Sequence, residues 1–340
     1  MISRPAVFLT HSPSVLANYY GPRAVAALEA VATVRCARDE IPFTAKTLAA
    51  AAQDCDIIIS DRRVEGGAEL LARLPNLVAF CRCAMDIRNI DVTAASAQGI
   101  LVTHASAGFM ASVSEWIVGM MVDLGRHISP TVAQYQSGLS PQLVMGRELR
   151  GSTLGIVGFG QIARYLADLA LAFGMRVCVA DPFVIIEHPN IRQVSMDALL
   201  AQSDFVVCLA SATPQTENLF GAAAFKAMQP SAYFINASRG NLVNETALLQ
   251  ALNEQLIAGC AIDVGRAPDQ MPSPDLARHP RLRATPHIGG LTPPAIEHQS
   301  LETAAQVAAI IRGQIPLGAV NAAHAKRLSA RFPFQPGTAS

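Results

Sequence analysis

Residues 151–182 read GSTLGIVGFGQIARYLADLALAFGMRVCVADP, and this stretch decides the fold. An apolar strand-like run, LGIVG, leads into two glycines, and a segment with apolar residues at 162, 166, 169 and 173 follows. That spacing places the apolar residues on one face of a helix. A second apolar run then ends at Asp181. The order strand, glycine turn, helix and strand predicts a β-α-β unit with a parallel sheet.

The glycine turn has the G-x-G-x-x-A spacing of dinucleotide-binding proteins. Gly158 permits a tight turn, and Gly160 lets backbone N–H groups approach a pyrophosphate. The small side chain of Ala163 lets the helix pack closely on the strand. Gln161 and Ile162 begin the helix, whose unpaired N–H groups face the anion. These residues predict a dinucleotide site.

Asp181 lies about twenty residues beyond the glycine turn, where a carboxylate accepts hydrogen bonds from a ribose diol. Pro182 and Phe183 come next, and this segment has no arginine to accept a 2′-phosphate. The sequence therefore predicts NAD, in preference to NADP, as the cofactor.

Composition limits the other functions. Of the 340 residues, 51% are hydrophobic and 15% charged, and 26 basic residues balance 26 acidic ones. Such a chain is expected to fold into two domains, and its charge gives no footprint for nucleic acid or a membrane surface. No apolar run reaches the ~18 residues of a membrane span, so a cytoplasmic protein is predicted. Most of the seven cysteines lie in apolar runs, which predicts reduced core thiols and no metal site.

Short apolar runs alternate with helix-like stretches in the first hundred residues, which indicates a first parallel α/β sheet. A longer apolar helix is predicted near residues 111–126, and residues 111 to about 289 read as a complete doubly wound domain. The helix-like segment that follows is expected to return to the first domain. The fold class is therefore α/β with two doubly wound parallel-sheet domains.

Polar clusters end three successive strands of the second domain: NASRG (236–240), AIDVG (261–265) and ATPHIGG (284–290). The carboxyl ends of parallel strands line one crevice, where a dinucleotide also lies. Arg239 and His287 are therefore expected to converge near the nicotinamide.

With these motifs the chain resembles the D-isomer-specific 2-hydroxyacid dehydrogenases, including D-3-phosphoglycerate dehydrogenases. The resemblance rests on GIVGFGQIAR, VADP, FKAMQPSAYFINASRGNLVNETALLQAL and ATPHIGG. It implies an NAD-binding Rossmann domain (106–290) inserted into a flavodoxin-like substrate domain (1–105 and 291–330), with a flexible tail (331–340). It also implies a homodimer held by the helix at 111–126, and an oxidoreductase that interconverts a D-2-hydroxy acid and its 2-oxo acid.

The resemblance also implies roles for single residues. Arg239 would anchor the substrate carboxylate in a bidentate pair and polarise the C2 oxygen. His287 would be the acid/base group. Asp263 would contact the nicotinamide carboxamide. The implied cofactor-binding residues further include Ala237, Ser238, Arg239, His287 and Gly289.

The loop DVGRAPDQ (263–270) departs from the family's pattern. The family's catalytic glutamate usually follows this Asp-Val by four residues, and Pro268 occupies that position here. The nearest carboxylate is Asp269. One hypothesis is that Asp269 replaces the glutamate as the partner of His287; Asp86 is the alternative.

A second departure lies in CRCAMDIRNID (81–91), where the family has a glycine-containing loop whose amides hold the substrate carboxylate. Here the substrate-binding positions are Ala84, Met85 and Asp86. An acidic residue beside an anionic substrate needs a compensating cation, and Arg82 and Arg88 are close in sequence. The substrate is therefore either larger than a simple 2-oxo acid or carries a hydroxyl or amine for Asp86. His104 is expected to be a satisfied core histidine.

Two functions from different classes remain at this point. One is the NAD-dependent D-2-hydroxyacid dehydrogenase, which the retained Arg239 and His287 favour. The other is a non-catalytic NAD-sensing or scaffold protein that kept the fold, which Pro268 and Asp86 favour. The substrate is not identified: phosphoglycerate, glyoxylate, hydroxypyruvate and bulkier 2-oxo acids all fit the motifs.

Overall fold

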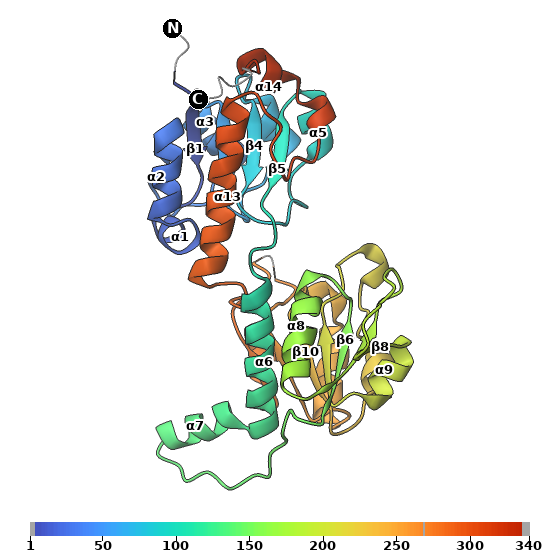
Figure 1. Cartoon of the computed structure of the whole chain (residues 1–340). Coiled ribbons are helices and arrows are strands. Elements are labelled where there is room, and N and C mark those ends of the chain that lie inside the picture. Colours follow the sequence, from blue (N-terminus) through green and yellow to red (C-terminus); the bar gives the residue numbers. More distant parts are fainter. Residues whose placement is uncertain (1–3, 268, 335–340) are drawn as a thin grey trace. The chain divides into compact units, whose positions relative to one another are not determined.

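The computed structural model describes residues 4–267 and 269–334. The chain forms two compact units (Figure 1). The first comprises Met1–Gly108 and Pro293–Ser340, and the second comprises Phe109–Thr292. Both contain a parallel sheet with helices on its two faces, so the predicted fold class is confirmed.

The sheet of the first unit has the order β2-β1-β3-β4-β5, and all its strands are parallel. The chain reverses its direction of growth between β1 and β3, which is the flavodoxin-like arrangement. The strands are β1 (Ala6–Leu9), β2 (Thr33–Cys36), β3 (Ile57–Ser60), β4 (Ala79–Arg82) and β5 (Leu101–His104).

Strand residues of the first unit alternate between two cores, because successive side chains point to opposite faces. Val7 and Leu9 pack with α13, whereas Phe8 packs with α3 and α4. The helices are α1 (Pro13–Tyr19), α2 (Pro22–Val31), α3 (Ala45–Ala52), α4 (Ala68–Ala72), α5 (Val92–Ala97), α13 (Pro293–Ile311) and α14 (Lys326–Arg331), with a 3-10 turn η3 (Ala322–His324).

Part of the segment expected to be a tail belongs to this unit. Arg331 ends α14, and its Nε lies 2.7 Å from Oδ1 of Asp56. The side chain of Phe332 is buried in the core. Residues 335–340 lie outside the described part of the chain.

The sheet of the second unit has the order β12-β11-β10-β9-β6-β7-β8 and is also parallel. Growth of the sheet reverses between β6 and β9, which is the Rossmann switch point. The strands are β6 (Thr153–Val157), β7 (Arg176–Ala180), β8 (Ile191–Gln193), β9 (Phe205–Cys208), β10 (Tyr233–Asn236), β11 (Gly259–Ile262) and β12 (Leu282–Ala284).

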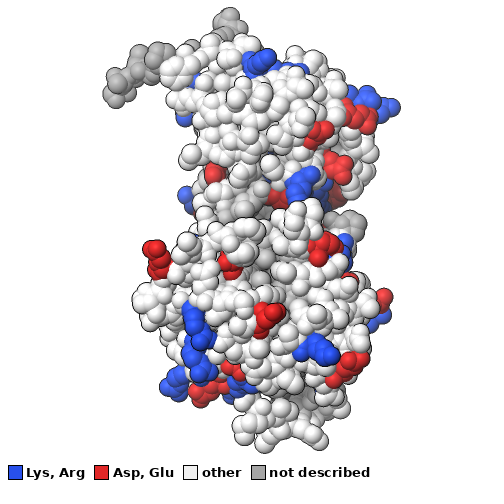
Figure 2. Space-filling model, turned by 90° about the vertical axis from the view of Figure 1, so that its right-hand side faces the viewer, with Lys and Arg blue, Asp and Glu red and all other residues white. Residues whose placement is uncertain are grey.

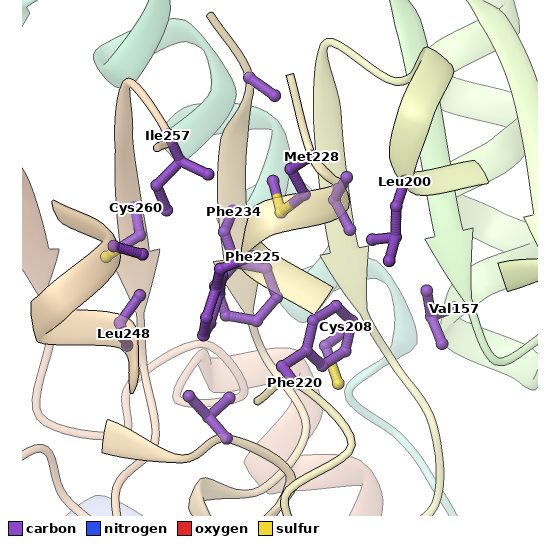
Figure 3. Packing of buried hydrophobic residues seen from close by; sticks show 14 of the residues in the cluster. Val157, Leu200, Cys208, Phe220, Phe225, Met228, Phe234, Leu248, Ile257 and Cys260 are labelled. Carbon is purple, nitrogen blue, oxygen red and sulfur yellow. The ribbon is translucent and has the colours of Figure 1, made fainter. Parts of the chain in front are cut away.

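Helices cover both faces of this second sheet. On one face α6 packs against α8. On the other face lies a core with Phe220, Phe225 and Phe234, in which the rings of Phe220 and Phe234 are 4.6 Å apart (Figure 3). The helices are α6 (Met110–Arg126), α7 (Ile128–Gln136), α8 (Gln161–Ala172), α9 (Met196–Gln202), α10 (Ala222–Ala227), α11 (Glu245–Asn253) and α12 (Pro274–Ala277), with 3-10 turns η1 (Pro214–Thr216) and η2 (Gly240–Leu242).

The cysteines are free thiols, as predicted, and six of the seven are buried. Burial raises the pKa of Cys81 and of Cys83 to about 12, so both thiols are protonated at neutral pH. Within the described ranges, no helix combines the length and apolarity needed to cross a membrane.

His11 follows β1 and is only 1% exposed. Its ring meets that of Tyr20 edge to face, 5.0 Å away, and its buried Nδ1 has no hydrogen-bond partner among the described residues. Burial lowers the pKa of His11 from 6.5 to about 4, although the charge of Asp61 opposes this shift. The imidazole is therefore neutral in the folded state at pH values where it is partly protonated in the unfolded state.

We predict that acid destabilises the first unit through His11. Its contribution is complete above pH 6.5 and is lost as the pH falls toward 4. The loss should reach about 3 kcal/mol, since each pKa unit corresponds to about 1.4 kcal/mol. Urea unfolding of the native chain and of His11→Leu across this pH range tests the prediction. Equal pH dependence in the two proteins would contradict it.

Candidate active site

The glycine turn after β6 is shaped for the close approach of another backbone. Gly158 has φ of +91°, and a Cβ at this position would lie 2.6 Å from backbone atoms of Ala210, at the end of β9. No side chain fits there. The turn thus lies at the switch point between β6 and β9, where open α/β sheets bind their ligands.

The residues at this turn fit a dinucleotide. Gly160 is the N-cap of the twelve-residue helix α8, and no side chain caps the first N–H groups. A Cβ added to Gly160 would meet no atom within 4 Å. Open space and uncapped donors at a helix N-terminus suit a pyrophosphate. Gln161 and Ile162 form the first turn of α8, as the sequence predicts.

Asp181 is fixed beside this turn. Its Oδ2 accepts a hydrogen bond from the backbone N–H of Phe159 at 2.7 Å, and its Oδ1 accepts one from Phe183 at 2.8 Å. The carboxylate therefore keeps one position at the end of β7, where it can accept from a ribose diol and repel a 2′-phosphate.

The loop after β10 is closed by Asn236, which the sequence analysis overlooked. Asn236 is buried; its Oδ1 accepts from the N–H of Ser238 at 3.1 Å, and its Nδ2 donates to the carbonyl of Arg239 at 3.0 Å. The hydroxyl of Ser238 donates to the carbonyl of Ala210 at 2.6 Å. This loop, with Ala237 in it, is thereby tied to the loop after β9. The sequence held one sign of this role: the last residue of β10 is an asparagine, whose side chain can both donate and accept hydrogen bonds.

Arg239 is half-buried, and its Nη1 donates to the carbonyl of Ser238 at 2.8 Å. The next residue, Gly240, packs so closely on Gly265 that a Cβ would overlap the backbone there. The arginine loop and the DVGRAPDQ loop are therefore in direct backbone contact.

Asp263 is 4% exposed and holds the histidine loop. Its Oδ1 accepts from the hydroxyl of Thr285 at 2.6 Å and from the N–H of Ile288 at 2.8 Å. Its Oδ2 accepts from the N–H of Gly289 at 2.7 Å. These bonds give the carboxylate a structural task that the sequence did not reveal. Its contact to the nicotinamide stays a prediction.

His287 lies between the donors that Asp263 holds. Its φ is +56°, a left-handed conformation that is uncommon for a residue with a side chain. Such a conformation persists only where the surroundings enforce it. The N–H of His287 donates to the carbonyl of Thr285 at 2.9 Å, and the ring is half-buried. Asp263 therefore holds the backbone on both sides of the predicted acid/base residue.

The DVGRAPDQ loop carries Asp269, the first candidate to replace the family's glutamate. Pro268 lies outside the described residues. Asp269 is exposed, and its Oδ1 accepts from the N–H of Met271 at 3.0 Å, within its own loop. The N–H of Gly265 donates to the carbonyl of Gln270 at 2.9 Å and closes this loop. Pairing of Asp269 with His287 stays a prediction, as does pairing of Asp86 with His287.

In the first unit, Arg82 does not have the position expected of a cation beside the substrate. It is 0% exposed, because it ends a central strand beneath the loop that follows β4. Its Nη1 donates to the carbonyl of Asp61, and its Nη2 donates to the carbonyl of Val64 at 2.8 Å and to Oδ1 of Asn89 at 2.6 Å. Burial lowers its pKa to about 10, so the guanidinium stays charged. Arg82 fastens the loops after β3 and β4 together.

The remaining predicted residues of this unit lie at the same edge of the sheet. Ala84 and Met85 follow β4, and Met85 is 45% exposed. Asp86 forms an ion pair with Arg88. His104 ends β5, and its Nδ1 lies 2.9 Å from the carbonyl oxygen of Ala105, so its ring has a partner, as predicted, although the residue is half-buried and not part of the core.

We predict that Asp263→Asn loosens the histidine loop. An amide nitrogen cannot accept the bonds that the second carboxylate oxygen accepts, and the loss should lower the free energy of unfolding by about 2 kcal/mol. Hydrogen exchange at Ile288 and Gly289 should become faster. Asp269→Asn is the matched control, because that carboxylate is exposed. Unchanged exchange at both amides in Asp263→Asn would contradict the role assigned to Asp263.

The comparisons with known proteins agree with this geometry. The model of the "D-isomer specific 2-hydroxyacid dehydrogenase, NAD binding domain" matches residues 118–289. This match lies within the second unit and confirms NAD as the cofactor.

Among curated proteins, D-3-phosphoglycerate dehydrogenase 2 of Saccharomyces cerevisiae is 34% identical over 267 residues, covering 74% of this chain and 57% of the yeast protein. D-3-phosphoglycerate dehydrogenase of Synechocystis is 33% identical over 244 residues, 71% of this chain and 44% of that protein. The chain spans about half the length of the curated relatives it matches.

Among solved structures, the TT0316 protein of Thermus thermophilus has a TM-score of 0.83 at 26% identity and covers 93% of this chain and 99% of its own. The apo-structure of D-lactate dehydrogenase from Escherichia coli has a TM-score of 0.81 at 22% identity, with the same coverage, and shows the fold alone. The chain belongs to the D-isomer specific 2-hydroxyacid dehydrogenase family.

Proposed function

We propose that the protein is an NAD-dependent dehydrogenase that interconverts a D-2-hydroxy acid and its 2-oxo acid. The observation that carries this proposal is the set of loops after β10, β11 and β12. These neighbouring strands present Arg239, Asp263 and His287 at one edge of the sheet. Asp263 holds the loop of His287 by three hydrogen bonds, and an ordered loop is what an acid/base group requires.

Each residue then has a defined task. Bound NAD supplies the hydride chemistry. The uncapped N–H groups of α8 would hold its pyrophosphate, and Asp181 would accept hydrogen bonds from the ribose. Arg239 binds the substrate carboxylate through the planar fork of its guanidinium and polarises the C2 oxygen. His287 donates a proton to that oxygen during reduction and removes it during oxidation.

The substrate is proposed only as a class. The curated relatives are named for D-3-phosphoglycerate, and phosphoglycerate, glyoxylate, hydroxypyruvate and bulkier 2-oxo acids all fit the motifs. A carboxylate beside the reacting carbon is common to these compounds, and Arg239 recognises that group. Ala84, Met85 and Asp86 are proposed to contact the rest of the substrate.

Turnover of NADH with a panel of 2-oxo acids tests the function. We expect oxidation of NADH by the native chain, and a loss of about a hundredfold or more in kcat for His287→Asn. NADH binding should be weakened at most modestly in the variant, because the glycine turn and Asp181 are unchanged. Tight NADH binding without turnover of any acid would contradict the enzyme and favour the sensing or scaffold function.

We also propose that two copies of the chain associate through α6 and the segment after it, here called the arm (residues 128–145). Apolar side chains are exposed along the arm: Ile128, Val132, Tyr135, Leu139, Leu143, Val144 and Met145, with Leu143 and Met145 at 104% and 94% exposure. Such a run of exposed apolar residues is typical of a protein interface. A neighbouring copy is its proposed occupant, since the family resemblance implies a homodimer.

The base of the arm is held in place. Oδ1 of Asp123 accepts from the N–H of Ser129 at 2.5 Å and from its hydroxyl at 2.7 Å, and Oδ2 accepts from Nε of Arg283 at 3.0 Å.

Charges of both signs are interspersed on the face of the molecule shown in Figure 2, and this face has no patch of one sign that would attract nucleic acid. The free thiols fit a reducing compartment, so we place the activity in the cytoplasm.

We predict that Leu143→Asp combined with Met145→Asp converts a dimer to a monomer, because a charged arm cannot be buried against a second copy. Light scattering measures the mass, and circular dichroism checks that the variant remains folded. A native chain that is monomeric at all concentrations, or a doubly substituted chain that stays dimeric, would disprove the proposed interface.

A further inference from the structure

Asp86 and Arg88 close an ion pair on the loop that follows β4. Nε of Arg88 lies 3.0 Å and 3.1 Å from the two carboxylate oxygens, and its Nη2 lies 2.6 Å from Oδ2. The backbone N–H of Arg88 also donates to Oδ1, at 3.0 Å. The pair is therefore bidentate and formed by residues two positions apart. It needs no other element to assemble it.

The pair is set on a fixed base. Asn89 accepts from the buried Arg82, and its Nδ2 donates to the carbonyl of Arg62 at 3.2 Å. The ion pair itself is not buried, since the side chain of Arg88 is 57% exposed and that of Asp86 is 21% exposed. Burial alone therefore does not require Asp86 to have a cationic partner.

We propose that Arg88 is a specificity-determining residue whose charge offsets that of Asp86, so that the loop accepts an anionic 2-oxo acid. This inference rests on the proposed function, in which the loop contacts the substrate. An uncompensated carboxylate there would repel the substrate carboxylate, and the repulsion would weaken binding of substrate and transition state alike. Arg88 thus permits an acidic residue at a position that otherwise excludes one.

A purely structural role for Arg88 is the competing explanation. Variants that remove the charges at positions 86 and 88 singly and together distinguish this role from the charge-offsetting role. If Arg88 only closes the loop, removing its side chain harms the loop whatever residue stands at position 86. If Arg88 offsets a charge, removing its side chain weakens substrate binding much less once Asp86 has also lost its charge. The comparison therefore requires Arg88→Gln, Asp86→Asn and the double variant.

Steady-state kinetics with one 2-oxo acid that the native chain reduces is the test. We expect Arg88→Gln to raise KM about tenfold with little change in kcat, and added salt to reduce that increase. The double variant Asp86→Asn with Arg88→Gln should have a KM several-fold lower than that of Arg88→Gln alone, because the repelling carboxylate is gone as well. Arg73→Gln, which breaks the exposed pair of Arg73 with Glu69 in the same unit, is the matched control and should change neither constant.

Two results would overturn the inference while the dehydrogenase stands: an unchanged KM in Arg88→Gln, or a double variant as poor as the single one. A native chain that binds NADH and reduces no acid would instead overturn the proposed function, and the inference with it.

Discussion

The carboxylate of Asp263 is the group on which the candidate site depends. It is buried, and it is stabilised by one hydroxyl and two backbone N–H donors, all from the segment that carries His287. A buried carboxylate is costly unless it is hydrogen-bonded, so the loop and the carboxylate stabilise each other. Gly289 is part of this fit, because a Cβ there would lie 2.9 Å from Oδ2 of Asp263. His287, with its left-handed conformation, lies within the segment that these contacts hold.

From Asp263 a series of close contacts extends across the carboxyl edge of the second sheet. Gly240 touches Gly265, the hydroxyl of Ser238 reaches Ala210, and Ala210 in turn leaves no room for a side chain at Gly158. The cofactor turn, the arginine loop and the DVGRAPDQ loop are thus held against one another by close backbone contacts and by the hydroxyl of Ser238. Pre-positioned groups of this kind are what catalysis by proton transfer and charge stabilisation requires. The edge keeps this order although the family's glutamate is replaced.

Much of the fold was predictable from the sequence, because local patterns determine it. The glycine spacing, the strand after it and Asp181 predict the Rossmann turn, and Arg239 and His287 follow strands in the expected order. The contacts that give residues their tasks were not predictable. Asp263 receives donors 22 to 26 positions away, and only the pairing of β11 with β12 brings these donors to it.

Arg82 shows the same limit in the first unit. Its place in the sequence suggested a cation beside the substrate. In the structure its strand lies between β3 and β5, and its guanidinium donates hydrogen bonds to carbonyls of the loop after β3. The bidentate pair of Asp86 and Arg88 depends on a local turn that residue types alone do not specify. Arg88 was expected as a compensating cation on the basis of its place in the sequence, and in the structure it forms an ion pair with Asp86.

Transfer of hydride from NADH to C2 of a 2-oxo acid tests the proposed dehydrogenase most directly. NADH deuterated at its transferable position would be incubated with the protein and a 2-oxo acid, and the product would be examined by mass spectrometry and chiral chromatography. We expect a D-2-hydroxy acid that carries one deuterium at C2. An L product, or a hydroxy acid without deuterium, would contradict the proposed function.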